Sequence, residues 1–145
     1  MKTLVILLFY SLLSYTGLFI AQAQNTQNGL SPLELVNQQI EGWNTHNATL
    51  FAMPYSDTTQ LFIFPQKSLK AFRSIKELQQ YYADFFTKNP VVQCQIKGQI
   101  VLGNTVVLNE YITGRADGKI LESIVTYKIS NGKIVSVYFD RKEVR

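Results

Sequence analysis

The chain has 145 residues, of which 46% are hydrophobic, 12% aromatic and 17% charged, with 14 Lys and Arg against 10 Asp and Glu. This composition excludes a disordered polar chain and a collagen-like repeat, because the apolar content is ordinary for a globular protein. A single cysteine, Cys94, cannot form an internal disulfide, which excludes a disulfide-stapled mini-protein. Length and composition together favour one compact domain.

The N-terminal segment has the three-part pattern of a secretory signal peptide. Lys2 precedes an apolar run that extends to Ile20, and Ala21-Gln22-Ala23 follows. Signal peptidase recognises small residues at this spacing after an apolar segment, so we predict cleavage after Ala23. The alternative is an uncleaved membrane anchor, since the run from Thr3 to Ile20 is just long enough to cross a bilayer.

This processing would divide the chain into a signal peptide at residues 1–23, a polar leader at residues 24–30 and one folded domain at residues 31–145. No cysteine follows the predicted cleavage site to carry a lipid. We therefore expect a periplasmic or secreted protein without a stable membrane anchor. The triplet Asn47-Ala48-Thr49 matches a glycosylation sequon, which matters only in a eukaryotic secretory pathway.

The first half of the domain begins with strong helix signals. At Ser31-Pro32-Leu33-Glu34 the sequence supplies a capping hydroxyl, a proline at the first helical position and a Glu three residues after the cap. Apolar residues then recur at helical spacing as far as Trp43. Asn47 can cap a short second helix, Ala48–Met53, which Pro54 would end.

A strand and a third helix are predicted next. The β-branched and aromatic segment from Thr59 to Phe64 reads as a short strand, followed by a loop rich in Lys and Ser. Ser74-Ile75-Lys76-Glu77 repeats the capping pattern and begins an aromatic helix that should end before Asn89-Pro90.

From Val91 onward the apolar residues alternate with a period of two, which predicts four antiparallel strands joined by short turns. The predicted strands are Val91–Leu102, Thr105–Arg115, Lys119–Ser130 and Lys133–Arg141. With no crossover helix between them, these strands form a meander. The predicted fold class is therefore α+β, a curved antiparallel sheet with helices on one face.

Turn chemistry gives an expected register. If Asn131-Gly132 forms a two-residue turn, counting back from it places Thr126 opposite Val137 and Glu122 opposite Arg141. A three-residue turn at 116–118 carries this register to the preceding strand. The more apolar face, which should meet the helices, would carry Val106, Leu108, Glu110, Ile112, Ile124, Thr126, Val135, Val137 and Phe139. The opposite face would be rich in tyrosine, with Tyr111, Tyr127 and Tyr138.

Glu110 is the most informative residue of that apolar face. Burying an isolated carboxylate costs several kcal/mol unless the group is paired or protonated. Glu110 must therefore lie at the rim in an ion pair, or line a cavity where it handles a proton or a ligand hydroxyl. Both readings remain open from the sequence.

The sequence lacks the motifs of several common kinds of functional site. The single histidine, His46, falls in a predicted loop, and no HxH, CxxC or HExxH spacing exists, so we expect no metal site. The Gly-x-Ser-x-Gly, P-loop and GxGxxG patterns are absent too, and no cofactor is expected. Basic residues are scattered rather than interleaved with stacking aromatics, so no nucleic-acid partner is expected.

Six short stretches of the domain, in this order and spacing, resemble the nuclear transport factor 2-like superfamily and, within it, the SnoaL-like group. They are Gly42-Trp43-Asn44-Thr45-His46-Asn47, Tyr55-Ser56-Asp57, Phe72-Arg73-Ser74-Ile75, Tyr82-Ala83-Asp84-Phe85-Phe86, Val125 to Ile134, and Tyr138-Phe139-Asp140. The resemblance implies a cystatin-like, cone-shaped fold whose sheet and helices enclose a pocket. It also implies a homodimer through the outer sheet face in many members.

The superfamily that the chain resembles includes ketosteroid isomerases, but this chain departs from their catalytic pattern. The segment that carries their general base reads Leu61-Phe62-Ile63-Phe64-Pro65 here. Their two oxyanion donors fall near Gln39 and near residues 124–126, where no matching proton donor stands. Steroid isomerisation is therefore not expected, since it needs a base beside the reacting carbon.

Three hypotheses follow. The first is an exported SnoaL-like domain that binds a small apolar molecule in its cone, through Trp43, Phe62, Phe64, Tyr82, Phe86, Glu110, Thr126 and Phe139. The second is a lyase, cyclase or isomerase with Glu110 as catalytic acid or base, assisted by Tyr81 or Tyr82. The third is a protein-interaction module that uses the outer, tyrosine-rich face.

The export hypothesis predicts a defined mature end. Mass measurement of the protein recovered from the periplasm or medium of an expressing cell should show Gln24 as the first residue. Intact Met1 in a membrane fraction would instead establish the anchor.

Overall fold

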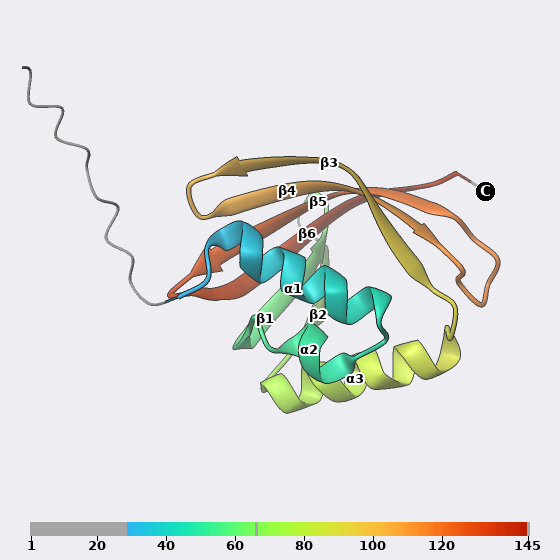
Figure 1. Ribbon diagram of the computed structural model, residues 1–145, viewed down its shortest axis with the longest axis horizontal. Helices are drawn as coiled ribbons and strands as arrows, with labels where there is room; N and C mark the ends of the chain where they lie inside the picture. Colours follow the sequence, from blue (N-terminus) through green and yellow to red (C-terminus); the bar gives the residue numbers. More distant parts are fainter. Residues whose placement is uncertain (1–28, 66, 145) are drawn as a thin grey trace, which may run out of the picture.

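The computed structural model describes residues 29–65 and 67–144, which form a curved sheet with helices packed against it (Figure 1). The elements are α1 (Pro32–Asn44), α2 (Ala48–Ala52), β1 (Tyr55–Ile63), β2 (Lys67–Ala71), α3 (Ile75–Lys88), β3 (Gln93–Leu102), β4 (Thr105–Thr113), β5 (Leu121–Ser130) and β6 (Lys133–Glu143). The predicted signal peptide and most of the predicted leader lie outside the described residues. Within the described part, no helix is long and apolar enough to cross a membrane.

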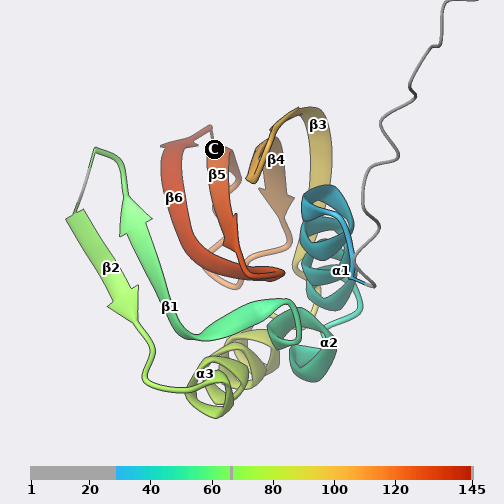
Figure 2. The same ribbon diagram turned by 90° about the vertical axis from the view of Figure 1, so that its left-hand side faces the viewer.

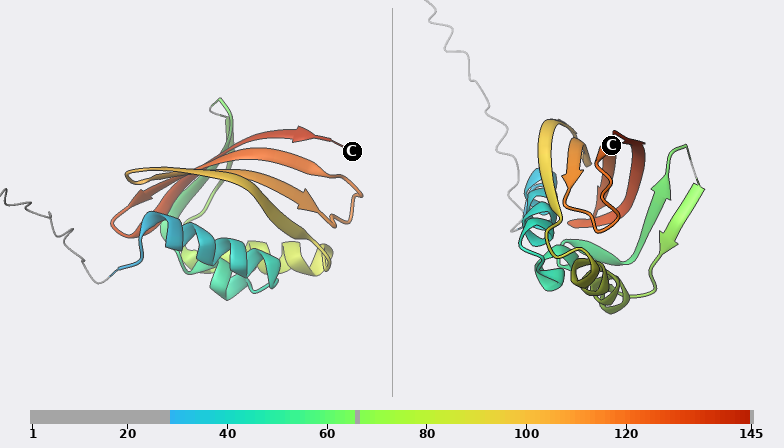
Figure 3. Two further views of the ribbon diagram at one scale, coloured as in Figure 1. Left: turned by 45° about the horizontal axis from the view of Figure 1, so that its top comes forward. Right: turned by 90° about the vertical axis from the view of Figure 1, so that its right-hand side faces the viewer.

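One six-stranded sheet, in the order β2-β1-β6-β5-β4-β3, organises the domain. The sheet curves strongly, and α1 lies beside β3 while α3 lies beneath the end formed by β1 and β2 (Figure 2). All three helices lie on the same side of the sheet (Figure 3). The α+β architecture expected from the sequence is therefore confirmed.

The helices begin where the capping residues predict. The Ser31 hydroxyl accepts a hydrogen bond from the Glu34 amide at 3.3 Å, and the Glu34 carboxylate accepts one from the Ser31 amide at 2.7 Å. At α3 the Ser74 hydroxyl caps the Glu77 amide, but the Glu77 carboxylate accepts from the Arg73 amide, one residue before the expected donor. Such caps contribute about 1 kcal/mol each by satisfying amides that have no helical partner.

The four-stranded meander is confirmed, whereas the segment before α3 is more regular than predicted. The expected loop after Pro65 contains β2, and β1 begins at Tyr55 rather than at Thr59. Four of the five β2 residues are exposed, so β2 has no apolar alternation that would reveal a strand. It is an edge strand held by backbone pairing to β1, and its two lysines protect that edge from further pairing.

The predicted register of β5 is wrong by one residue. Ser130 pairs with Lys133 as expected, but a bulge follows at Lys128/Ile129, so that Thr126 pairs with Tyr138 rather than with Val137. The predicted three-residue turn at 116–118 is wrong too, because β4 ends at Thr113 and β5 begins at Leu121, and Glu110 pairs with Ser123. Because neighbouring side chains in a strand point to opposite faces, the two shifts together turn the whole of β5 over.

The shift changes which β5 side chains lie under the helices. Ser123, Val125 and Tyr127 are buried on the inner face, while Thr126 and Ile124 lie on the outer face. The expected pairing of Glu122 with Arg141 is also wrong, since Arg141 lies opposite Ser123. In contrast, β4 has the predicted orientation, with its inner residues Val106, Leu108, Glu110 and Ile112 all buried.

The helices meet where a glycine permits it. At Gly42, in α1, an added Cβ would lie 2.2 Å from the backbone nitrogen of Phe51, in α2. That separation is far below van der Waals contact, so the two helices can approach this closely only because Gly42 has no side chain. The approach places Phe51 in the core beside α1.

Replacing Gly42 by Ala should therefore destabilise the domain by at least about 2 kcal/mol, because the backbone of α2 must move. Gly98 provides the matched control, because a Cβ added there would have no atom within 4 Å. Gly98→Ala should stay within about 0.5 kcal/mol of wild type. Urea unfolding of both variants tests this, and equal effects would contradict the packing described for Gly42.

Candidate functional site

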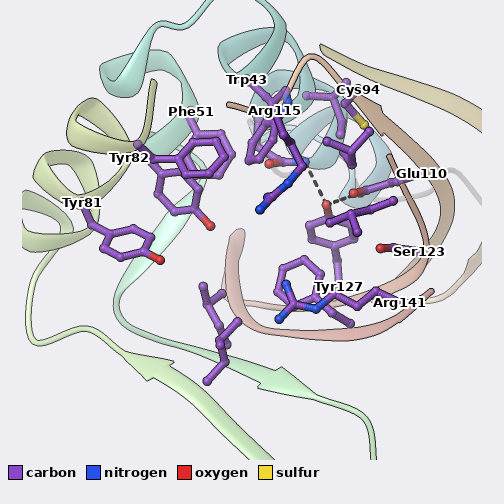
Figure 4. A pocket seen from close by; sticks show the side chains of 18 of the residues that line it. Trp43, Phe51, Tyr81, Tyr82, Cys94, Glu110, Arg115, Ser123, Tyr127 and Arg141 are labelled. Atoms are coloured by element: carbon purple, nitrogen blue, oxygen red, sulfur yellow. Dashed lines mark hydrogen bonds between the residues drawn. The ribbon is translucent and has the colours of Figure 1, made fainter. Parts of the chain in front are cut away.

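A cavity of about 320 Å³ lies between the inner face of the sheet and the helices (Figure 4). This volume lies within the usual range for small-molecule sites. Aromatic side chains from α1, α2, α3, β1 and β6 form much of its lining: Trp43, Phe51, Tyr55, Tyr81, Tyr82, Phe85 and Phe139.

The aromatic rings of the helices pack tightly against one another. The ring centroids of Phe51 and Tyr82 are 4.0 Å apart, and those of Trp43 and Phe85 are 5.1 Å apart. Phe86 contacts Trp43 from behind in an edge-on arrangement at 5.7 Å. This cluster gives the cavity one apolar wall that is held in place by its own packing.

A directional chain of buried hydrogen bonds ends at the carboxyl group of Glu110. The Tyr55 hydroxyl donates to Gln39 Oε1 at 3.3 Å, Gln39 Nε2 donates to the Tyr127 hydroxyl at 2.9 Å, and that hydroxyl donates to Glu110 Oε1 at 2.6 Å. All four residues are buried and all line the cavity. They form what we call the polar floor.

Glu110 has the environment of a group that can change its protonation near neutral pH. Glu110 is only 5% exposed, and burial raises the pKa of its carboxyl group to about 7. The hydrogen bond from Tyr127 favours the ionised form and partly opposes this rise in pKa. Glu110 can therefore either accept or donate a proton in the cavity.

Three buried tyrosine hydroxyls and the Cys94 thiol around the cavity stay protonated. Burial raises the pKa of the Tyr55, Tyr82 and Tyr127 hydroxyls, and the nearby charge of Glu110 adds to each rise. Burial also raises the pKa of the Cys94 thiol. These tyrosines are hydrogen-bond donors rather than bases, and Cys94 is not an activated nucleophile.

The cavity opens past less buried side chains, which we call the mouth. Tyr81, Leu69 and Arg141 are exposed, and Arg115 is half-buried. The guanidinium group of Arg115 forms a two-point ion pair with Asp117, with Nε–Oδ1 at 3.0 Å and Nη2–Oδ2 at 2.6 Å. No ion pair within the described part of the chain engages Arg141.

The structure brings half of the proposed ligand-binding residues to the cavity. Trp43, Tyr82, Glu110 and Phe139 line it. Among the others, Thr126 lies on the outer face because of the register shift.

The remaining aromatic residues of the proposed set lie away from the cavity lining. Phe62 stacks on Tyr138 of the outer face with centroids 4.8 Å apart, and Phe64 is 61% exposed. Phe86 is buried behind the aromatic wall, where it supports Trp43.

Sequence reasoning missed the donors of the polar floor. Tyr127 was assigned to the outer face because of the register error. Gln39 had a usable signal, since it follows Leu35 by four residues and Val36 by three in the apolar stripe of α1. A polar residue at such a buried helical position must find a partner, and here the partners are two tyrosine hydroxyls.

His46 lies outside the cavity lining and makes structural contacts. His46 Nε2 lies 2.9 Å from the Val92 carbonyl oxygen, and its ring packs edge-on against Phe86. His46 therefore joins the α1–α2 loop to the segment before β3. Across residues 29–65 and 67–144, no group of three His, Cys, Asp or Glu side chains could hold a metal ion.

A sequence profile described as the SnoaL-like domain matches residues 36–137 of the chain. No curated protein matches the chain.

Several solved structures share the fold. An uncharacterised cystatin-fold protein from Novosphingobium aromaticivorans superposes with a TM-score of 0.69 at 19% identity, covering 77% of this chain and 99% of that one. A nuclear transport factor 2-like protein from Cytophaga hutchinsonii gives 0.63 at 15% identity, covering 80% and 94%. A candidate SnoaL-like polyketide cyclase from Jannaschia gives 0.62 at 14% identity, covering 77% and 85%. These similarities confirm the expected cystatin-like, nuclear transport factor 2-like fold.

The buried Glu110 predicts a stability that falls as pH rises from about 4.5 to about 7. In this window the folded chain keeps a proton on Glu110 that the unfolded chain has lost, so the unfolding free energy decreases with pH. The total loss is on the order of 3 kcal/mol. Glu110→Gln has no such proton, so its unfolding free energy should not show this loss. Between about pH 5 and about pH 8, the difference in unfolding free energy between variant and wild type should therefore shift in favour of the variant.

Urea unfolding of wild type and Glu110→Gln across this range measures the difference. Tyr127→Phe should extend the window to higher pH, because it removes the hydrogen bond that lowers the Glu110 pKa in the folded state and leaves the unfolded-state pKa unchanged. A gap between wild type and Glu110→Gln that does not change with pH would contradict the burial of an ionisable Glu110.

Proposed function

This chain belongs to the SnoaL-like family, and on that basis we propose that it is an exported protein that binds a small, mostly apolar molecule in its cavity. The aromatic wall suits a ring-shaped molecule, since flat rings pack favourably against Trp43, Phe51 and Phe139. The polar floor suits one hydroxyl or carbonyl group on that molecule. In small-molecule sites, a small number of polar groups in an otherwise apolar cavity fix the orientation of the ligand.

The observation that carries this proposal is the incomplete pairing of the Glu110 carboxyl group. Glu110 is buried and lines the cavity, yet within the described part of the chain only its Oε1 accepts a side-chain hydrogen bond. Oε2 is not among the fully buried side-chain atoms that lack a partner, so it faces the open space of the cavity. A ligand hydroxyl in the cavity can therefore donate a hydrogen bond to Oε2.

Proton transfer is the second candidate function, and the environment of Glu110 favours it specifically. A carboxyl group with a pKa of about 7 is suited to act as general acid or base at neutral pH. The reaction class would be a cyclisation, elimination or isomerisation that removes a proton beside a carbonyl group. The Tyr82 hydroxyl, which points into the cavity, would then donate to the carbonyl oxygen (Figure 4).

The outer face of the sheet supports a separate proposal, a homodimer. The register shift removes Tyr127 from this face and adds Ile124, which is 45% exposed, to the face that carries the stacked pair of Phe62 and Tyr138. Exposed aromatic and aliphatic side chains set among polar ones are typical of protein interfaces. A protein-interaction module that uses this face alone is the function to expect if the cavity binds no small molecule.

Calorimetric titration with 2-naphthol and with naphthalene tests ligand binding. Wild type should bind 2-naphthol about tenfold more tightly, because its hydroxyl can donate to Glu110. Glu110→Gln should reduce the affinity for 2-naphthol and leave that for naphthalene unchanged. Thr126→Val, on the outer face, is the matched control and should bind both probes like wild type.

The Glu110→Gln variant also distinguishes catalysis from binding. If Glu110→Gln keeps its affinity for an enolisable ketone but no longer exchanges the α-protons of the ketone with solvent, Glu110 is a general base. If neither naphthalene nor 2-naphthol binds wild type, the cavity proposal is wrong and the outer face becomes the leading site.

A further inference from the structure

Three polar residues form a row across the inner face of the sheet. Glu110 of β4 lies opposite Ser123 of β5, and Ser123 lies opposite Arg141 of β6. All three line the cavity. Since neighbouring strands are about 4.8 Å apart, the Cα atoms of Glu110 and Arg141 are separated by roughly 10 Å.

The row runs from the floor of the cavity to its mouth. Glu110 and Ser123 are buried, whereas Arg141 is exposed. The small Ser123 side chain lies between the Glu110 carboxyl group and the Arg141 guanidinium group, and no ion pair joins the two. A negative or neutral oxygen therefore faces the deep end of the cavity and a positive charge faces the entrance.

Each member of the row keeps an unused hydrogen-bonding group within the described part of the chain. No side-chain hydrogen bond among the described residues engages Glu110 Oε2, the Ser123 hydroxyl or the Arg141 guanidinium group, and none of these atoms is fully buried without a partner. Arg115 differs, because Asp117 already binds its guanidinium group at two points. Arg141 is therefore the cation of the mouth that is available to a ligand.

We propose that the ligand is an aromatic hydroxy acid whose carboxylate binds Arg141 at the mouth and the adjacent buried Ser123, while its hydroxyl group donates to Glu110 at the floor. This inference rests on the proposed binding function and names the ligand class. The planar guanidinium group matches the two oxygens of a carboxylate, and the serine hydroxyl can donate to one of them. A two-ring skeleton along the aromatic wall can link the two ends of the row. A phosphate ester fits less well, since its further charge would need a second free cation.

The probes are 6-hydroxy-2-naphthoate and its methyl ester, which differ at one end by a negative charge and a methyl group. In calorimetric titrations, wild type should bind the acid about tenfold more tightly than the ester, because only the acid makes charge-assisted hydrogen bonds to Arg141. Arg141→Gln should lower the affinity for the acid about tenfold and change that for the ester less than about twofold. Arg141→Lys keeps the charge without the planar group and should recover part of the preference.

Lys142→Gln is the matched control, since it removes the same charge from the next residue of β6, which points to the opposite face. It should keep the preference for the acid. Equal binding of acid and ester by wild type, or equal effects of Arg141→Gln and Lys142→Gln, would overturn the proposed ligand class. The cavity proposal would survive either result as long as the ester binds. If neither probe binds a wild-type protein that does bind 2-naphthol, only the proposed ligand class is overturned, whereas failure of 2-naphthol and naphthalene as well would overturn both proposals.

Discussion

The hydrogen bond from the Tyr127 hydroxyl to the Glu110 carboxyl group, at 2.6 Å, is the contact on which the site depends. A carboxyl group at this depth is costly, and a single bond offsets only part of that cost. The remaining cost appears as a pKa raised to about 7 and as an oxygen with no partner in the described part of the chain. A structure built only for stability would place an apolar residue at this position, so the cavity is the feature that explains Glu110.

The rest of the fold holds this contact in place. Gln39 of α1 donates to the Tyr127 hydroxyl, so the first helix is tied to the middle of the sheet through the site itself. The close approach of α1 and α2 at Gly42 brings Phe51 into the aromatic wall. The sheet curves strongly (Figure 2), and the cavity lies between this wall and its inner face (Figure 4). The cavity is therefore lined by residues that are also structural, which keeps its shape defined without a ligand.

The sequence predicts most of the fold because its signals are local. Capping residues such as Ser31 and Ser74 determine where helices begin, and the alternation in β4 alone places Glu110 on the inner face. The bulge at Lys128/Ile129 cannot be predicted in this way, because it depends on pairing between two strands and leaves no local pattern. The bulge explains why Arg141 was expected opposite Glu122, and together with the longer connection between β4 and β5 it explains why Thr126 was expected in the cavity in place of Tyr127. The exposed edge strand β2 was missed because it buries no apolar face.

The central claim is that the carboxyl group of Glu110 is buried against an accessible cavity. Following the carboxyl ¹³C chemical shift of Glu110 by NMR as a function of pH, with and without a bound naphthalene-type probe, tests both halves of the claim in one measurement. The account predicts a titration midpoint near 7 in the free protein and a clear change of that midpoint when the probe is bound. A midpoint at the ordinary value for glutamate, or one that saturating probe leaves unchanged, would contradict it.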